Sequence, residues 1–369
     1  MKTIQNYARL FISTGLVTFL STFATADVPT DEAIAAAIEV SLFNDPYAAP
    51  NDTEISVIDG VATLQGTVSS IQASSRTAAI AESRRGVRSV VNLIKVEPRP
   101  VANEELKERV ARALRWDPVA KQQEVTVEVT DGSIKLRGLA SSIGAKREVA
   151  RVASRVRGVK AVSNFIEVDF GAPRTDDEIQ AHIVKRWRWH TYIDPDNLRI
   201  DVKDGVVVVS GAVGTSSERQ ATVHLAEVAG VKDIDASKLS VNPRERDKTQ
   251  KTPRNLARSD EQIAEAIRDG WAHDPRVFSF EPELTVKKGF VTLRGKVGSL
   301  AAKNAAAQVA RNTPGANLVQ NHLKVRPKTP SRDDLAITDD IRKALVEDPG
   351  TDAYEIGVQV RDGNVILRG

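Results

Sequence analysis

One short segment carries the clearest structural signal, and it reads Val125-Thr126-Val127-Glu128-Val129-Thr130-Asp131-Gly132-Ser133-Ile134-Lys135-Leu136-Arg137-Gly138. Apolar and polar residues alternate on both sides of Asp131-Gly132, which is typical of two half-buried antiparallel strands joined by a tight turn. Glycine adopts a positive φ without steric cost, so Gly132 is predicted to be a structural turn residue. The segment therefore predicts a β-hairpin.

The same phrase recurs along the chain. Asp-Gly opens four of its five copies, and Lys288-Gly289 stands at this place in the fourth copy. A second glycine follows each turn glycine six residues later, a spacing that matches neither phosphate-binding glycine pattern. Such self-similarity is the signature of a repeat architecture. The predicted structural turn glycines are Gly60, Gly132, Gly205, Gly289 and Gly363.

A first helix is predicted before every hairpin. Apolar residues spaced i, i+4, i+8 lie on one helical face, and an Asp-Pro pair ends each pattern. Thr175 with Glu178, and Ser259 with Gln262, have the spacing of capping boxes at two of the helix starts. The apolar stripes are Ile34/Ile38/Leu42, Leu106/Val110/Leu114, Ile179/Ile183/Trp187, Ile263/Ile267/Trp271 and Ile337/Ile341/Leu345.

A second helix and a last strand are predicted after each of the first four hairpins. The helix is clearest over residues 145–156, and a glycine ends it. The strand alternates over residues 162–168, whereas the third copy shifts the pattern by one residue, to Leu239 and Val241. One module is therefore predicted to be an α+β unit of order α-β-β-α-β, with two helices packed on a three-stranded mixed sheet.

The repeats and the linkers between them divide the chain. The fifth copy holds only a first helix and a hairpin, so we expect the sequence to be a fragment; the alternative is that this unit completes its sheet with another chain. The predicted parts are a signal peptide (1–26), module 1 (30–98), module 2 (103–170), module 3 (175–243), a basic linker (244–258), module 4 (259–327) and an incomplete module 5 (337–369).

Together these elements resemble the BON family. The resemblance is carried by residues 125–138 with 158–168, and again by 284–295 with 315–325, and it covers nearly the whole mature chain. It implies a non-enzymatic periplasmic protein that is linked to osmotic or envelope stress and engages phospholipid surfaces or other envelope components. A fold by itself does not determine function.

The first 26 residues have the features of a secretory signal peptide. Lys2 and Arg9 flank a polar start, a short apolar run follows over residues 10–20, and Ala24-Thr25-Ala26 supplies a small-x-small cleavage site. Cleavage after Ala26 and a periplasmic location are therefore predicted. No later segment approaches the length of a membrane-spanning helix, so no transmembrane segment is predicted in the mature chain.

Composition argues against several classes of site and partner. The chain has no cysteine, which excludes disulfides and a thiolate metal site. Lys2 and Arg9 are two of the 52 basic residues, so the mature chain is almost balanced against its 49 acidic residues. A nearly neutral exported chain predicts no nucleic-acid partner.

No catalytic residue, metal site or cofactor is predicted. The five histidines fall at different positions of the repeat, and no two have the His-x-His or His-x-x-x-His spacing of paired metal ligands. Residues 194–197 offer oxygen ligands but lack the downstream glutamate of a calcium loop, so a turn is predicted there. The recurring turn aspartates lie in different modules and are predicted to serve the turns.

Two helix ends combine tryptophan with cationic residues, a composition that suits a lipid headgroup boundary. Trp187 and Trp271 fall on apolar stripes and are predicted to be core residues, whereas Trp116 and Trp189 fall at the flanks of their helices. Packing against a neighbouring module is the alternative for these two flanking residues. The candidate membrane-contact residues are Arg112, Arg115, Trp116, Lys185, Arg186, Arg188 and Trp189.

Two hypotheses of function follow from this pattern. The preferred one is a surface-binding array that engages anionic phospholipid or envelope proteins through several weak sites acting together. The alternative is a structural or chaperone-like array in which sheet edges or helix faces contact other proteins and lipid has no role. Modules of this size bury limited cores, so contacts between copies, including an oligomer, are compatible with both.

Overall fold

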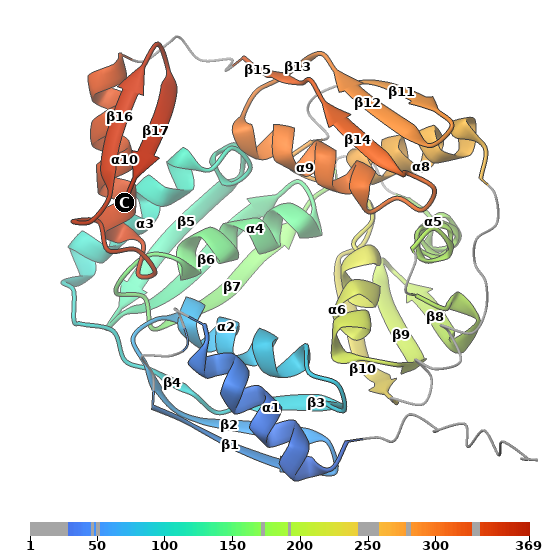
Figure 1. Ribbon diagram of the computed structural model, residues 1–369, viewed down its shortest axis with the longest axis horizontal. Helices are drawn as coiled ribbons and strands as arrows, with labels where there is room; N and C mark the ends of the chain where they lie inside the picture. Colours follow the sequence, from blue (N-terminus) through green and yellow to red (C-terminus); the bar gives the residue numbers. More distant parts are fainter. Residues whose placement is uncertain are drawn as a thin grey trace, which may run out of the picture.

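The computed structural model describes residues 29–45, 48, 52–170, 174–190, 193–242, 258–277, 282–326 and 333–369. The predicted signal peptide and its cleavage site lie outside these residues. Figure 1 shows the modules following one another in chain order, with the second helices α2, α4, α6 and α9 turned toward the middle of the assembly. Among the described residues, no helix has the length and apolar character needed to cross a bilayer.

Each of modules 1 to 4 has the predicted order α-β-β-α-β. In module 2, α3 (Asn103–Trp116) and η1 (Ala120–Gln122) precede the hairpin of β5 (Glu124–Thr130) and β6 (Ser133–Ala140), and α4 (Ile143–Ser154) leads to β7 (Ala161–Val168). Strand β6 pairs antiparallel with β5 and parallel with β7, so the three-stranded sheet is mixed, with β6 in its centre.

The other modules vary this plan slightly, and in module 1 β3 and β4 both pair with β2. Module 1 comprises α1 (Asp31–Phe43), β1 (Asp52–Ile58), β2 (Val61–Val68), α2 (Ile71–Glu82), β3 (Ser89–Asn92) and β4 (Lys95–Val96). Module 3 comprises α5 (Asp176–Arg188), η2 (Pro195–Asn197), β8 (Leu198–Lys203), β9 (Val206–Val213), α6 (Ser216–Leu225) and β10 (Asp233–Val241). Module 4 comprises α8 (Asp260–His273), β11 (Glu283–Lys287), β12 (Phe290–Arg294), β13 (Lys296–Val297), α9 (Leu300–Arg311), β14 (Leu318–Asn321) and β15 (Lys324–Val325). Module 5 comprises α10 (Asp334–Glu347), β16 (Gly357–Arg361) and β17 (Asn364–Arg368).

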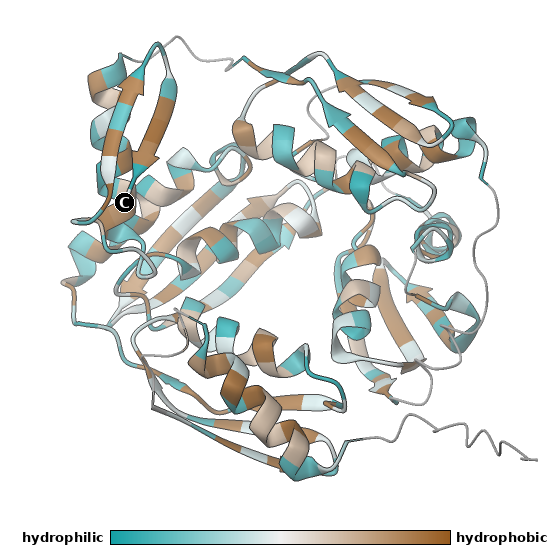
Figure 2. Ribbon diagram, in the orientation of Figure 1, coloured by the Kyte–Doolittle hydropathy of each residue, from teal (hydrophilic) through white to brown (hydrophobic). Residues whose placement is uncertain are grey.

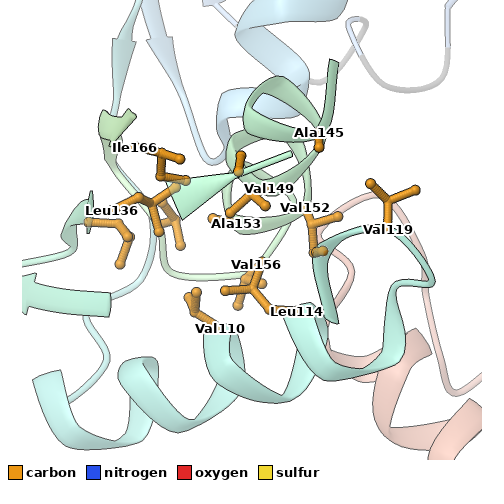
Figure 3. Close-up of a cluster of buried hydrophobic side chains, with 14 of the residues drawn as sticks. Val110, Leu114, Val119, Leu136, Ala145, Val149, Val152, Ala153, Val156 and Ile166 are labelled. Carbon is orange, nitrogen blue, oxygen red and sulfur yellow. The ribbon is translucent and has the colours of Figure 1, made fainter. Parts of the chain in front are cut away.

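Modules 1 to 4 each have their own apolar core. In module 2, Ile134 and Leu136 of β6 are fully buried, while Lys135 between them is exposed. Figure 3 shows Val110 of α3 and Val149 of α4 in the same cluster, and Figure 2 shows hydrophobic and hydrophilic residues alternating along the strands. The predicted helical stripes of these four modules are all buried. Burial of each large aliphatic side chain contributes about 1.5–3 kcal/mol relative to its exposure.

The stripe of module 5 is only half-buried. Its helix α10 covers a two-stranded hairpin, and in the described part of the chain this module has no second helix to close the core. Module 5 instead docks on module 2, where the backbone N–H of Arg157 donates to the carbonyl oxygen of Glu347 at 2.8 Å. Module 5 is therefore held partly by module 2.

Both central residues of each hairpin turn have a positive φ. Asp131 has a φ of 48° and Gly132 a φ of 80°, the combination that a type I′ turn requires. A Cβ atom at Gly132 would lie 3.0 Å from Cγ of Lys160 and 3.2 Å from the carbonyl oxygen of Gly158. The other turn glycines have a φ of 72° (Gly60), 78° (Gly205), 75° (Gly289) and 72° (Gly363).

An acidic residue at the start of the first helix anchors the turn. In module 4, the carboxylate of Asp260 accepts hydrogen bonds from the backbone N–H groups of Lys288 at 2.7 Å and Gly289 at 2.9 Å. The same pair of bonds recurs at the helix starts of modules 1, 3 and 5. In module 2, Asn103 accepts one bond, from Asp131 at 3.1 Å. The accepting residue always lies 28 residues before the first donor of the turn. This spacing is visible in the sequence, but the hydrogen bonds from the turn to the helix start were not predicted.

Substitution of Asp260 by Asn is expected to destabilise module 4 and to weaken its sensitivity to acid. The two backbone hydrogen bonds lower the pKa of Asp260, and the amide of Asn replaces one of the accepting oxygens by a donor. Because the pKa is lower in the folded state, the stabilisation is fully present above the unfolded value of about 4 and is lost as pH falls through the folded value.

The measurement is thermal unfolding of the full chain between neutral pH and about pH 3, a window set around that reference pKa. Glu283→Gln, at an exposed position of β11, is the charge-matched control. Identical pH profiles for Asp260→Asn and the control would contradict a stabilising role of the carboxylate.

Candidate functional site

The predicted site residues of module 3 gather at the C-terminal end of α5. Trp189 follows the last residue of the helix and is half-buried, and the guanidinium carbon of Arg258 lies 4.0 Å from its ring centroid. Arg188 is exposed, and Nζ of Lys185 donates to Oε1 of Glu265 at 2.8 Å. A hollow of about 600 Å³ lies beside the helix, and its described lining is Asp177, Gln180, Ala181, Val184, Lys185, Arg188 and Trp189.

Arg186 belongs to the interior of module 3. Its guanidinium donates to the carbonyl oxygens of Leu225 at 3.0 Å and Glu227 at 3.4 Å, at the end of α6. Burial lowers the pKa of Arg186, but a guanidinium keeps its charge at neutral pH. Arg186 therefore holds the two helices together and does not line the hollow.

The predicted site residues of module 2 lie where module 5 docks. Arg112 is 2.5 Å from Oε1 of Glu347, and its guanidinium carbon lies 6.0 Å from the ring centroid of Trp116. Trp116 is half-buried and lines a hollow of about 300 Å³ together with residues of α4 and α10. Arg115 is exposed. In module 2 the tryptophan and its nearest cation thus serve the contact between modules.

Three of the seven predicted residues, Lys185, Arg188 and Trp189, are therefore brought together at one hollow. Sequence reasoning missed Arg258, which adds a cation on the face of Trp189. A cation over an indole ring contributes about 0.5–1 kcal/mol at an exposed site. Arg258 precedes α8 and Trp189 follows α5, so no spacing rule along the chain relates them. The result is a cluster of cations around one amphipathic ring.

Polar contacts connect module 3 to its neighbours on the other side. Glu227 is buried and pairs with Arg147 of module 2, and burial lowers the pKa of Arg147. The amide of Gln220 in α6 donates to the carboxyl of Glu82 in module 1, whose pKa is raised by burial. Module 3, which carries α5, is thus held in place by contacts with modules 1 and 2.

These features define a class of protein: a tandem array of small α+β modules whose distinctive surface is a cationic and aromatic helix end. The BON domain profile matches residues 30–98, 102–169, 175–243, 259–327 and 333–369. The chain therefore belongs to the BON domain family and carries five tandem BON domains. This is a non-catalytic domain family, and its domains are associated with membrane and phospholipid binding.

The solved structures that resemble the chain include two of CdsD, described as a structural protein of the type III secretion system of Chlamydia trachomatis. The first is 13% identical, covers 59% of this chain and 98% of its own, and has a TM-score of 0.17. The second, of the C-terminal domain, is 13% identical, covers 58% and 100%, and has a TM-score of 0.16. TM-scores this low do not support a shared arrangement of modules. No curated protein matches the chain.

Proposed function

We propose that this BON array binds anionic phospholipid surfaces of the cell envelope, without catalysing a reaction, and that the C-terminal end of α5 is its principal contact. The observation that carries this proposal is the gathering of Lys185, Arg188 and Trp189 around one hollow, with Arg258 against the tryptophan ring. Tryptophan favours the membrane interface, and each cation near an anionic surface contributes about 1 kcal/mol.

The contact is weak at any one module. Lys185 is already paired with Glu265 and Asp177 lies on the same hollow, so the local positive charge is partly offset. Arg115 in module 2 offers a smaller second contact because it is exposed at the end of α3. Several such contacts on one chain combine by avidity, since the second binding event is intramolecular once the first has occurred.

The envelope location is part of the proposal. It is supported by Lys2 and Arg9, the apolar run of residues 10–20 and the Ala24-Thr25-Ala26 site, which together favour export and cleavage after Ala26. The BON family's association with phospholipid binding supports contact with a membrane surface. We also propose that the protein contributes to tolerance of envelope or osmotic stress.

The test is co-sedimentation of the full chain with vesicles of phosphatidylcholine alone or mixed with phosphatidylglycerol, each at two ionic strengths. The chain is expected to pellet with the anionic vesicles at low salt and to be released at high salt, because ions screen charges beyond about 10 Å at 0.1 M. The double variant Arg188→Ala/Trp189→Ala is expected to bind several-fold less.

Lys135→Ala is the matched control, because this cation is exposed on the outer face of a sheet. It should bind as the unchanged chain does, and circular dichroism should show both variants to be folded. Equal recovery of all three proteins in every condition would remove the end of α5 from consideration and favour the protein-interaction alternative.

A further inference from the structure

Side chains of α5 in module 3 contact side chains of α8 in module 4. Lys185 of α5 pairs with Glu265 of α8. His182, three residues before Lys185, pairs with Asp269, four residues after Glu265. Nε2 of His182 is 2.9 Å from Oδ1 of Asp269. The ring of His273 meets that of His182 edge to face, with 4.2 Å between the centroids. Two imidazoles and a carboxylate from two modules thus converge.

We propose that His182, Asp269 and His273 form a binding site for a divalent transition-metal ion that joins modules 3 and 4. One ligand atom from each residue lies within 4.8 Å of the other two. Two imidazole nitrogens and one carboxylate oxygen are a donor set that Zn²⁺ takes in proteins, with water in the fourth position. The spacing of histidine pairs along the chain does not reveal this site, because an Asp and a His on one face of a helix meet a His of another module.

His273 is already oriented as a ligand. Its Nδ1 lies 2.7 Å from the backbone carbonyl oxygen of Asp269, so this nitrogen carries the proton and Nε2 keeps its lone pair. Metal-binding histidines are typically fixed in this way, by donating the second ring N–H to a carbonyl or carboxylate oxygen. Metal binding uses the neutral imidazole, whose unprotonated nitrogen donates its lone pair to the ion.

The three ligand atoms lie within 4.8 Å of one another, whereas a tetrahedral site needs them closer together. Bonds of about 2.0–2.1 Å to the metal place neighbouring ligand atoms roughly 3.3 Å apart. The pair formed by His182 and Asp269 is already within that separation, so the adjustment falls mainly on His273. Asp269 and His273 are spaced i, i+4 and therefore share one face of α8. All three side chains are only half-buried, which leaves them room to rotate toward a bound ion.

Two neighbouring cations, Arg174 and Arg186, oppose the metal. Nη1 of Arg174 lies 3.3 Å from Nδ1 of His182, which must then be an acceptor. A metal on Nε2 makes Nδ1 a donor, so Arg174 has to turn away, and its exposed position allows this. Arg186 donates to two neutral backbone carbonyl oxygens, so its charge also opposes a metal at the cluster, whereas Lys185 is paired with the carboxylate of Glu265. Removal of Arg174 should therefore strengthen metal binding.

Calorimetric titration of the metal-free full chain with Zn²⁺ near pH 7 tests the proposal. Saturation at one ion per chain is expected. Asp269→Asn and His273→Gln should each weaken the affinity at least tenfold, in line with the loss of a direct ligand. Arg174→Ala should tighten binding. His322→Gln, at an exposed histidine of module 4 outside the cluster, should leave the affinity unchanged.

Two further readouts separate a built site from general surface binding. Co²⁺ bound at the same site should give the intense visible bands of four-coordinate geometry, and Zn²⁺ should raise the melting temperature of the unchanged chain but not of His273→Gln. Absence of saturable binding, or equal affinities of Asp269→Asn, His273→Gln and the unchanged chain, would overturn the proposal. Neither result bears on the vesicle experiment, because Arg188 and Trp189 are not ligands.

Discussion

Substitution of Trp187 by Ala is expected to lower the free energy of unfolding of module 3 by about 3–5 kcal/mol, the range for truncation of a buried aromatic side chain. Only 1% of Trp187 is exposed, and its indole N–H donates to the carbonyl oxygen of Thr222 in α6 at 3.0 Å. The substitution removes the apolar contacts between α5 and the sheet and leaves that carbonyl without its donor, which adds to the cost. Trp187 is therefore expected to be a main anchor of the core of module 3.

Trp189→Ala is the matched control, because it removes the same side chain two residues later, where the ring is half-buried. Hydrogen exchange of the backbone amides in β9 should be strongly accelerated in Trp187→Ala and little changed in Trp189→Ala. Similar exchange in the two variants would show that Trp187 does not anchor the core of module 3.

Gly132→Val is expected to destabilise module 2 by more than about 1 kcal/mol, since a β-branched residue at positive φ is strained by roughly 1–3 kcal/mol. The φ of Gly132 is 80°, and Lys160 and the carbonyl oxygen of Gly158 leave little room for a side chain. The two causes can be separated. At Gly363, where φ is 72°, a Cβ atom would meet nothing within 4 Å, so Gly363→Val carries the backbone strain alone.

Hydrogen exchange of β5 and β6 is the readout for Gly132→Val, and that of β16 and β17 for Gly363→Val. The loss of protection should be greater in module 2, while vesicle binding through module 3 should persist. Unchanged protection of β5 and β6 would contradict the assignment of Gly132 as a structural turn residue.

The elements within a module could be predicted because their signals are local. The stripes on α3 and α5, the capping boxes at Thr175 and Ser259, and the burial of Trp187 all depend on residues a few positions apart. The shifted last strand of module 3 is also confirmed, since the register of β10 changes between Asp235 and Lys238. Apolar periodicity and the spacing of capping residues were sufficient for these features.

The hydrogen bonds that join this irregular strand to its helix could not be predicted. In module 2, the side-chain amide of Asn164 in the last strand donates to the carbonyl oxygen of Lys146 in α4 at 3.0 Å. In module 3 the direction is reversed: Arg219 of α6 donates to the carbonyl oxygens of Ala236 at 2.8 Å and Leu239 at 3.1 Å. An asparagine of the strand makes this connection in module 2, and an arginine of the helix makes it in module 3. A search for one repeated residue type would therefore find the asparagine and miss the arginine.

The candidate site was predicted only in part, because contacts between modules depend on how the modules are oriented. The composition near Trp116 and Trp189 is similar, yet Trp116 lines the hollow shared with α10 whereas Trp189 meets Arg258 beside the hollow along α5. The meeting of His182 with Asp269 has the same origin. A repeat period describes each module by itself and contains no information on which faces of two modules pack together.

The face of α5 beside Trp189 is the proposed membrane contact, and a site-specific fluorophore measures this contact directly. The chain has no cysteine, so Ala181→Cys, exposed and lining the hollow, provides a unique labelling site, and Ser163→Cys, exposed on the sheet of module 2, provides the control. With anionic vesicles that contain a quencher-labelled lipid, we expect strong quenching of the label at position 181 and little at position 163. Absence of quenching at 181, or equal quenching at both positions, would contradict the proposed contact.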